Sequence, residues 1–474
     1  GAVYYNLAIQ KSAGTVGLSA SSTVVNPLDL SGTGGTLDSQ SAVLTVVGAA
    51  TIAAGNTATT SNGTLSFGST VSSTGSIGIG TTGSIAITGT FRNNGTLDLG
   101  SGTVTSTGVL TNPTTGTIHG RSGTLVLVGG LTNTGTFNPQ SGTVIFHGSS
   151  VGVNQLTYNN LRIRGTATLS GSSVTSTVTG TFNIDSGATL TMTNSGVSEE
   201  AVHLILVGGG TNAGTLTLVA GGSYGPTVTS TAAFTNTGTI NAAGTLNFGS
   251  SLTNSGTFSA GTSRVRYTGS SASNVGSAVY YSLDFIGGAT YTVTASTTAM
   301  ATTTVASGAT VSLGSSILTA MGDITNSGTV STGTGAFRHP VDYTRVTDRA
   351  GTVVASIAEG DSIYLTVRDQ NRNLNGSVVE TIVVPFAGDS ASGSDSESIT
   401  LTETGASTGI FRNTSAVTTH TGTIATDNGI FDFFASGVGT ATYTDTHGGP
   451  DVGTATASIV RAASTAGSGG GGGG

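Results

Sequence analysis

The sequence of 474 residues has no cysteine, no tryptophan, only seven prolines and few charged residues, which make up 8% of the chain. Without cysteine there is no disulfide framework, no thiolate metal site and no thiol nucleophile. The few prolines and the irregular spacing of glycine exclude a collagen triple helix. The basic residues form no cluster that would indicate nucleic-acid binding, and no apolar run approaches the roughly 20 residues of a membrane span.

Glycine, threonine and serine are what the chain has in excess, with 76 glycines alone. Together with valine they disfavour helix. Hydrophobic residues still make up 36% of the chain, and many of them alternate with polar ones. Such a chain can bury apolar surface, which a disordered polymer cannot. The composition therefore predicts an all-β protein.

A unit of about 20 residues repeats along the chain. Gly-Thr pairs begin at Gly95, Gly116 and Gly135, and a second series with the same spacing begins at Gly102. Each unit is predicted to hold two short strands, with the apolar residue after the threonine pointing inward. One coil cannot bury its inner face alone, whereas stacked coils can. The pattern predicts a β-solenoid (β-helix) of about 16 coils.

One seven-residue phrase stands out within these units. "LTNTGTF" at 131–137 recurs with small changes at 234–240, 252–258 and 324–330. Asparagine and glycine tolerate positive φ, so we expect them to turn the chain at a coil corner, with ladders of asparagine and threonine outside. The residues predicted to point inward are Phe137, Ile240, Phe258 and Val330.

A longer repeat overlies the first. Residues 142–163 resemble residues 261–285, and "GAVYYNLAI" at 1–9 matches the end of both. No capping element is evident at either end of the array. We therefore expect residues 1–9 to complete the coils of a preceding subunit, or of a preceding segment in a longer parent chain. A head-to-tail contact that does not close gives a filament. The predicted subunit-contact residues are Val3, Tyr4, Tyr5, Leu7, Ile9 and Phe337.

The composition shifts after residue 337. Residues 1–337 hold 8 of the 22 carboxylates, and the remaining 137 residues hold 14. Segments of alternating hydrophobicity then predict a sandwich of antiparallel strands at 346–462, followed by a flexible glycine-rich tail at 463–474. The predicted organisation is a solenoid at 1–337, the sandwich and the tail.

Three segments of the sandwich carry a family resemblance. "GDSIYLTVRDQNRN" (360–373), "SITLTETGASTGIFR" (398–412) and "ATYTD" (441–445) resemble, in the same order, an immunoglobulin-like module of large microbial surface proteins. Such a sandwich would bring the loops after its second and sixth strands to the same end. Their oxygen-bearing side chains suit a hard cation such as Ca²⁺, although Asp and Asn also simply make turns. The candidate ligands are Asp369, Asn371, Asn373, Asp445 and Asp451, and no other cofactor is expected.

Few residues indicate catalysis. The carboxylates of Glu199 and Glu200 would point to opposite faces of a strand, so they could not act together unless they lay in a loop. Two arginine pairs, 162/164 and 264/266, occupy equivalent positions and could bind an anionic sugar, but pairs so far apart in the chain are more typical of a charged surface or a subunit contact. We therefore predict that the protein is not an enzyme.

The Gly-Thr coils and the "GTVxFxG…YxNLxI" junctions resemble repeat arrays of large secreted bacterial adhesins and surface fibres. This resemblance implies export and attachment. The predicted function is that of an extracellular or cell-surface structural subunit that stacks head-to-tail on itself into a filament. The alternative is a carbohydrate-binding adhesin segment of a longer surface protein, with surface glycans as partners and no self-assembly.

Overall fold

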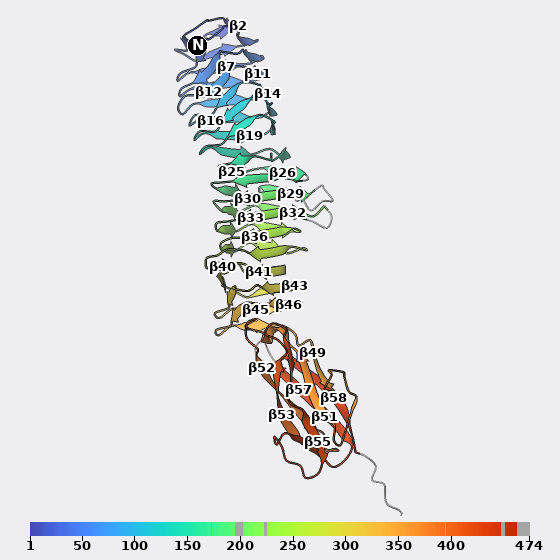
Figure 1. Ribbon diagram of the computed structural model, residues 1–474. Coiled ribbons are helices and arrows are strands. Elements are labelled where there is room, and N and C mark those ends of the chain that lie inside the picture. The colour runs from blue at the N-terminus through green and yellow to red at the C-terminus, as the bar shows by residue number, and fades with distance from the viewer. Residues whose placement is uncertain (172, 195–201, 222–224, 394, 447–450, 462–474) are drawn as a thin grey trace, which may run out of the picture. The chain divides into compact units, whose positions relative to one another are not determined.

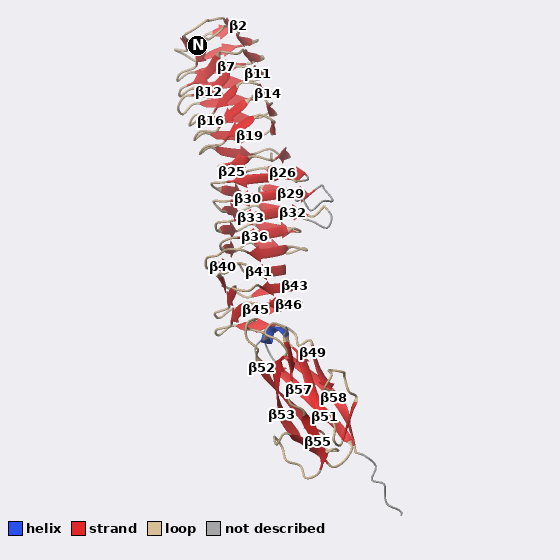
Figure 2. Cartoon of the chain, viewed as in Figure 1, coloured by secondary structure: helices blue, strands red, loops and turns tan. Residues whose placement is uncertain are grey.

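The computed structural model describes residues 1–171, 173–194, 202–221, 225–393, 395–446 and 451–461 (Figures 1 and 2). Glu199, Glu200 and the predicted tail 463–474 lie outside the described residues. The chain forms two compact units, residues 1–281 and residues 282–474. Strands dominate both, and the helical turn described is the 3₁₀ turn η1 (Gln370–Arg372). In the described ranges, no helix has the length and apolarity to cross a membrane.

The first unit is a stack of parallel coils, and it confirms the predicted β-solenoid, which has about 16 coils in all. One coil is made of β10 (Thr64–Phe67), β11 (Val71–Ser73) and β12 (Ser76–Ile79). Each strand pairs in parallel with the corresponding strand of the next coil, so that β10 lies beside β13 (Ser84–Ile87) in register. Backbone hydrogen bonds therefore run along the stack, from coil to coil.

One sheet of 13 strands runs the whole length of this unit, from β1 (Val3–Tyr4) to β37 (Leu252–Asn254). The other two faces change at the junction between the long repeats. There, β25 (Asn160–Ile163) continues the long sheet, while β23 (Val151–Gly152) and β24 (Thr157–Tyr158) begin new sheets. The junction recognised in the sequence is thus where the coil changes its cross-section.

The core lies inside the coils because alternate side chains point inward. In β10, Leu65 and Phe67 are buried, whereas Thr64 and Ser66 are partly exposed. Burying one such side chain contributes roughly 1.5–3 kcal/mol, and the register repeats the gain in each coil. Of the four residues predicted to point inward after the Gly-Thr pairs, Ile240 and Val330 are buried, whereas Phe137 and Phe258 are only partly buried.

The prediction of two strands per coil is wrong, since each coil of the first unit has three. The "LTN" part of the repeated phrase is itself a strand and not a corner. The strands with this sequence or a close variant are β17 (Leu110–Asn112), β20 (Leu131–Asn133), β34 (Phe234–Asn236), β37 and β46 (Ile324–Asn326). A three-residue strand ending in asparagine resembles a turn in sequence, because asparagine is depleted from strands.

The asparagine ladder lies inside the coils, which corrects the prediction of an external one. Asn93 and Asn112 are fully buried. The Nδ2 of Asn93 donates to Oδ1 of Asn112 at 2.7 Å, and Asn112 donates to Asn133 at 2.7 Å. A second ladder runs from Asn212 through Asn236. Buried amides are tolerated here because each coil supplies the hydrogen-bond partner of the next.

The glycines of the phrase serve a different purpose from the predicted positive φ. Gly95 and Gly135 do not have positive φ. A Cβ at Gly95 would lie 1.9 Å from the carbonyl oxygen of Gly75 in the preceding coil. Glycine is therefore needed for close backbone approach between coils. Positive φ occurs instead at another corner, at Arg121 (φ 49°) and Gln140 (φ 48°).

The second unit begins with further parallel coil strands and continues into a mixed sheet. The coil strands are β42 (Thr290–Val293), β43 (Thr297–Val305), β44 (Thr310–Ser312), β45 (Ile317–Ala320), β46, β47 (Thr329–Ser331) and β48 (Ala336–Arg338). Antiparallel pairing starts where β49 (Tyr343–Thr347) meets β51 (Ser362–Arg368).

The mixed sheet has ten strands, and it closes around its own core of Val, Ile, Leu and Phe side chains. This part of the chain forms the predicted β-sandwich. Its remaining strands are β50 (Ser356–Ala358), β52 (Thr381–Gly388), β53 (Ser396–Glu403), β54 (Ile410–Arg412), β55 (Val417–Thr421), β56 (Ile430–Phe433), β57 (Gly437–Asp445) and β58 (Asp451–Val460).

Candidate functional site

The last coil of the solenoid is covered by a segment of the sandwich, residues 370–376, which we term the cap segment. It comprises η1 and the residues that follow. All three terminal strands of the coil receive hydrogen bonds from it. The last coil and the cap segment both belong to the second unit. The sequence shows no cap next to the last coil, because the cap comes from a loop about 35 residues further on.

The hydrogen bonds of the cap segment replace those of a further coil. At β46, the Oε1 of Gln370 accepts the N–H of Ile324 at 2.6 Å. At β47, the N–H of Val330 donates to the carbonyl of Leu374 at 2.6 Å. At β48, the Nδ2 of Asn371 donates to the carbonyl of Phe337 at 2.8 Å. Open strand edges invite pairing with another chain, and this edge is closed.

Asn373 adds a reciprocal pair to this contact. Its Nδ2 donates to the carbonyl of Asn326 at 3.2 Å, and the Nδ2 of Asn326 donates to the carbonyl of Asn373 at 2.6 Å. Glu380 holds the cap segment from the other side, since its Oε1 accepts the N–H groups of Leu374 and Asn375. The cap is therefore fixed to both the coil and the sandwich.

The predicted cation ligands are partly brought together beneath the cap segment. Asn371 donates from Nδ2 to Oδ2 of Asp445 at 2.9 Å. The hydroxyl of Tyr443 donates to Oδ2 of Asp369 at 2.6 Å. Asp369, Asn371 and Asp445 are fully buried. The side chain of Asn373 turns to the last coil instead, and that of Asp451 lies outside what the structure describes.

The surroundings of the buried Asp369 carboxyl shift its pKa. Burial raises the pKa of Asp369 to about 7, and the charge of Asp445 adds to this effect. The hydrogen bond from Tyr443 and the charge of Arg372 oppose it. Burial and the neighbouring carboxylates also raise the pKa of the Tyr443 hydroxyl, which keeps it a hydrogen-bond donor. The opposing effects are the smaller ones, so the pKa of Asp369 stays raised.

The first coil differs sharply from the last. Among the described residues, β1, β2 (Leu7–Ile9) and β3 (Thr15–Gly17) each pair with a following coil only. Val3 and Tyr5 are 73% and 71% exposed. Five of the six residues predicted for the subunit contact thus belong to an open coil, although Ile9 is buried.

Phe337, the sixth predicted contact residue, lies on β48 in the last coil. Its side chain is fully buried in its own chain, and its carbonyl is bonded to the cap segment. The sequence could not show this, because burial there depends on a loop remote from it in the sequence.

The predicted anion-binding arginines 162 and 164 are already paired. The Nε atoms of both lie near the Asp185 carboxylate, at 2.8 Å for Arg162 and 3.4 Å for Arg164. The Asp185 carboxylate therefore neutralises part of the positive charge of Arg162 and Arg164 on the coil surface. Such exposed pairs contribute only about 0–1 kcal/mol each to stability.

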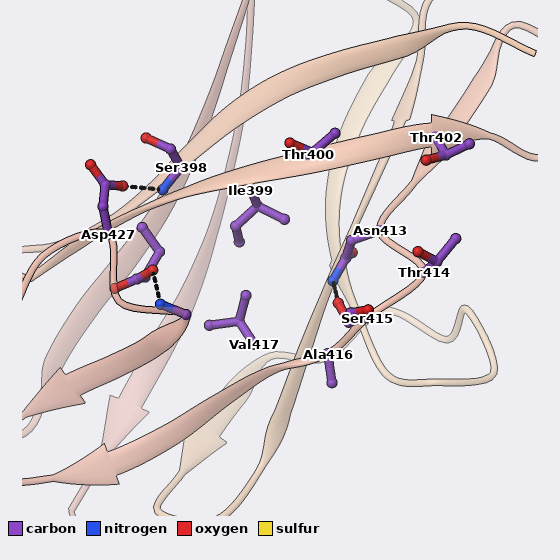
Figure 3. Close-up of a pocket in the computed structure, with 12 residues that line it drawn as sticks. Ser398, Ile399, Thr400, Thr402, Asn413, Thr414, Ser415, Ala416, Val417 and Asp427 are labelled. Carbon is purple, nitrogen blue, oxygen red and sulfur yellow. Dashed lines mark hydrogen bonds between the residues drawn. The ribbon is translucent and has the colours of Figure 1, made fainter.

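The sandwich carries an open groove of about 460 Å³ between β53 and the segment that leads into β55 (Figure 3). At one end, Asp427 accepts the N–H of Ser398 at 2.8 Å, and Glu397 accepts the N–H of Gly429 at 2.9 Å. The side chains of Ile399 and Val417 lie between this end and a series of hydroxyl groups (Figure 3). The hydroxyl-bearing lining residues are Ser398, Thr400, Thr402, Thr414 and Ser415.

Within the described residues, no group of three or more His, Cys, Asp or Glu side chains is arranged to hold a metal ion. Asparagine oxygens, which the cap cluster would use, are not among those residue types. Comparison with known proteins found no matching family model and no matching curated protein.

Proposed function

We propose that this chain is a structural subunit of an extracellular filament or surface fibre, in which the first solenoid coil stacks on the solenoid of a neighbouring subunit. The observation that supports it most is the comparison of Tyr4 with its equivalents inside the chain. By sequence alignment these are Tyr158 and Tyr280.

Both internal tyrosines are fully buried, whereas Tyr4 is exposed. The ring of Tyr158 packs 6.0 Å from that of Phe137, on β21 (Thr136–Asn138) of the preceding coil, and 6.4 Å from that of Phe146, on β22 (Thr143–Phe146). The ring of Tyr280 packs 5.1 Å from Phe258. Phe137 and Phe258 both follow a Gly-Thr pair. A coil that presents a phenylalanine in this position would cover Tyr4 in the same way.

The cap segment sets a condition on head-to-tail stacking. A second copy offers its last coil as the receiving surface, but that coil carries the cap on β46, β47 and β48. Stacking therefore requires the cap segment to leave the coil. Subunits would remain separate while the cap is bound and polymerise when it is released, as open strand edges do.

Light scattering after size-exclusion chromatography, with negative-stain imaging, tests the proposal. Concentrated wild-type protein is expected to form filaments, and Tyr4→Asp is expected to prevent them, because it places a charge on the contact. Val43→Asp is the matched control, since Val43 is also exposed but lies on the side of the stack, on β7 (Val43–Val46).

A variant of the cap segment sharpens the test. Gln370→Ala combined with Asn373→Ala is expected to form filaments at lower protein concentration than the wild type. If wild type and cap variant both stay monomeric at high concentration, self-assembly through the solenoid ends is wrong.

A second candidate function is binding of a surface carbohydrate without self-assembly. The groove of Figure 3 favours it, because hydroxyl groups and two carboxylates can bond sugar hydroxyls around an apolar centre. A glycan array with the monomeric protein tests this function. Thr400→Val with Thr402→Val is expected to abolish a specific signal, and a signal unchanged by this substitution would exclude the groove as its source.

A further inference from the structure

We propose that Asp369, Asn371 and Asp445 form a binding site for one Ca²⁺ ion, which fixes the loop carrying the cap segment to the sandwich. The proposal is independent of filament formation. It concerns a buried cluster at the junction of η1 with β57, within the second unit.

Buried oxygen atoms without a hydrogen-bond partner carry the proposal. The Oδ1 atoms of Asp369, Asn371 and Asn373 are all buried and have no partner. They belong to alternate residues of one five-residue loop. Leaving a buried polar atom without a partner costs about 1–3 kcal/mol, and the oxygens of Asp369 and Asn371, only two residues apart, point to a bound species that accounts for both.

The contacts of these side chains place two of them beside Asp445. Asn371 is bonded directly to the Asp445 carboxylate at 2.9 Å, and Asp369 accepts the hydroxyl of Tyr443, which precedes Asp445 by two residues on β57. The third, Asn373, is engaged with Asn326 through Nδ2, which is why it is left out of the ligand set. The remaining set comprises two carboxylates and one amide oxygen.

The chemistry of this set selects the ion. All the donors are oxygen, two of them from carboxyl groups, and the part of the cluster that the structure describes includes no imidazole or thiolate. Ca²⁺ takes six to eight oxygen ligands in flexible geometry and accepts water for those that the protein does not supply. Zinc and copper prefer nitrogen and sulfur donors. A divalent cation would also offset the repulsion between the two buried carboxylates.

Binding of this ion would stiffen the cap. Asn371 bonds both Asp445 and the carbonyl of Phe337 on the last coil. Holding Asn371 in place therefore holds one end of the cap segment against β48. The ion would act on the solenoid end through the loop, without touching the coil.

Terbium luminescence tests the site, because Tb³⁺ replaces Ca²⁺ and is excited by a nearby tyrosine. The hydroxyl of Tyr443 is bonded to Asp369, which makes Tyr443 a suitable donor. Titration of the full chain with Tb³⁺ is expected to give a saturable signal at one ion per chain, which excess Ca²⁺ removes. Affinity for Ca²⁺ is expected in the range of roughly 0.1–1 mM, as in other extracellular modules.

Asp369→Asn and Asp445→Asn are expected to weaken binding at least 100-fold and to abolish the rise in Tm on adding Ca²⁺. Asp323→Asn is the matched control, since Asp323 is an exposed carboxylate in the same unit. Because Asn has nearly the same shape as Asp, the variants should keep a cooperative thermal transition in EDTA, which separates lost binding from lost folding.

Two results would overturn the proposal. One is the absence of any saturable Tb³⁺ signal and of any Tm change up to 10-fold above the upper end of that range. The other is binding that persists in Asp369→Asn and Asp445→Asn, which would place the ion elsewhere and leave water or a proton to satisfy the buried oxygens.

Discussion

The first and the last coil of the solenoid are built from the same repeat, yet one is open and the other is closed. In the first coil, β1, β2 and β3 have a strand partner on one side only, and Val3 and Tyr5 are exposed. In the last coil, a polar loop bonds every terminal strand. The difference shows that a parallel solenoid can be ended by a loop that satisfies its edge without continuing its coil. Natural repeat proteins need such ends for solubility.

The largest effect is expected away from both ends, where a coil has neighbours on each side. Gly95→Ala would place a Cβ 1.9 Å from the carbonyl oxygen of Gly75, so the coils must separate. We expect a loss of at least about 3 kcal/mol in unfolding free energy, measured by urea denaturation. Gly152→Ala, where no atom lies within 4 Å, should change it by no more than about 0.5 kcal/mol. Equal losses in both would refute close coil contact.

The next effect concerns the closed end. Gln370→Ala with Asn373→Ala removes the acceptor of the Ile324 N–H and the donor to the Asn326 carbonyl. We expect the second unit to lose about 1–3 kcal/mol, because a buried N–H is left without a partner. Scanning calorimetry measures it, with exposed Ser331→Ala as the control. An unchanged transition would mean that the cap is not a stabilising contact.

A smaller effect is a pH dependence confined to the second unit. The folded pKa values of Asp369 and Glu380 are both raised to about 7. A raised carboxyl pKa means that the folded state binds more protons, so stability falls as pH rises from about 4 to about 7. In EDTA, Tm of this unit should decline over that range, and Asp369→Asn should reduce the slope. If Asp369→Asn leaves this slope unaltered, the Asp369 carboxyl is not a cause of the pH dependence.

The smallest effect is on the side of the stack, at neither end. Asp185→Asn removes the partner of Arg162 and Arg164. We expect a stability change within about 1 kcal/mol, since the pairs are exposed. The freed arginines should increase retention on a sulfated polysaccharide column. Unaltered retention would indicate that this surface does not bind anions even when its own carboxylate is absent.

Local patterns in the sequence were enough to predict the solenoid, and they failed wherever the deciding contact is remote. The Gly-Thr spacing indicates stacked coils because each coil repeats the alternation of buried and exposed side chains. The strand "LTN" is not evident from the sequence, because its asparagine finds its hydrogen-bond partner on the next coil and not within its own segment. The repeated phrase does indicate that glycine is needed there. The reason is the close approach of the backbone of the neighbouring coil, which the sequence does not show.

The candidate sites, too, could be predicted only as far as local sequence patterns determine them. Alternation in the loop after β51 marked Asp369 and Asn371 as possible ligands, and the structure places Asn371 against Asp445. The same alternation could not show that Gln370 and Asn373 bond the last coil. Tyr443 was missed as well, because only the fold brings its hydroxyl to Asp369.

Amide hydrogen exchange at both solenoid ends tests the central comparison most directly. The account predicts that amides of β46, β47 and β48 are protected to nearly the same degree as those of interior coils, whereas β1, β2 and β3 exchange much faster in the monomer. Exchange at the last coil as fast as at the first would contradict the claim that residues 370–376 close it.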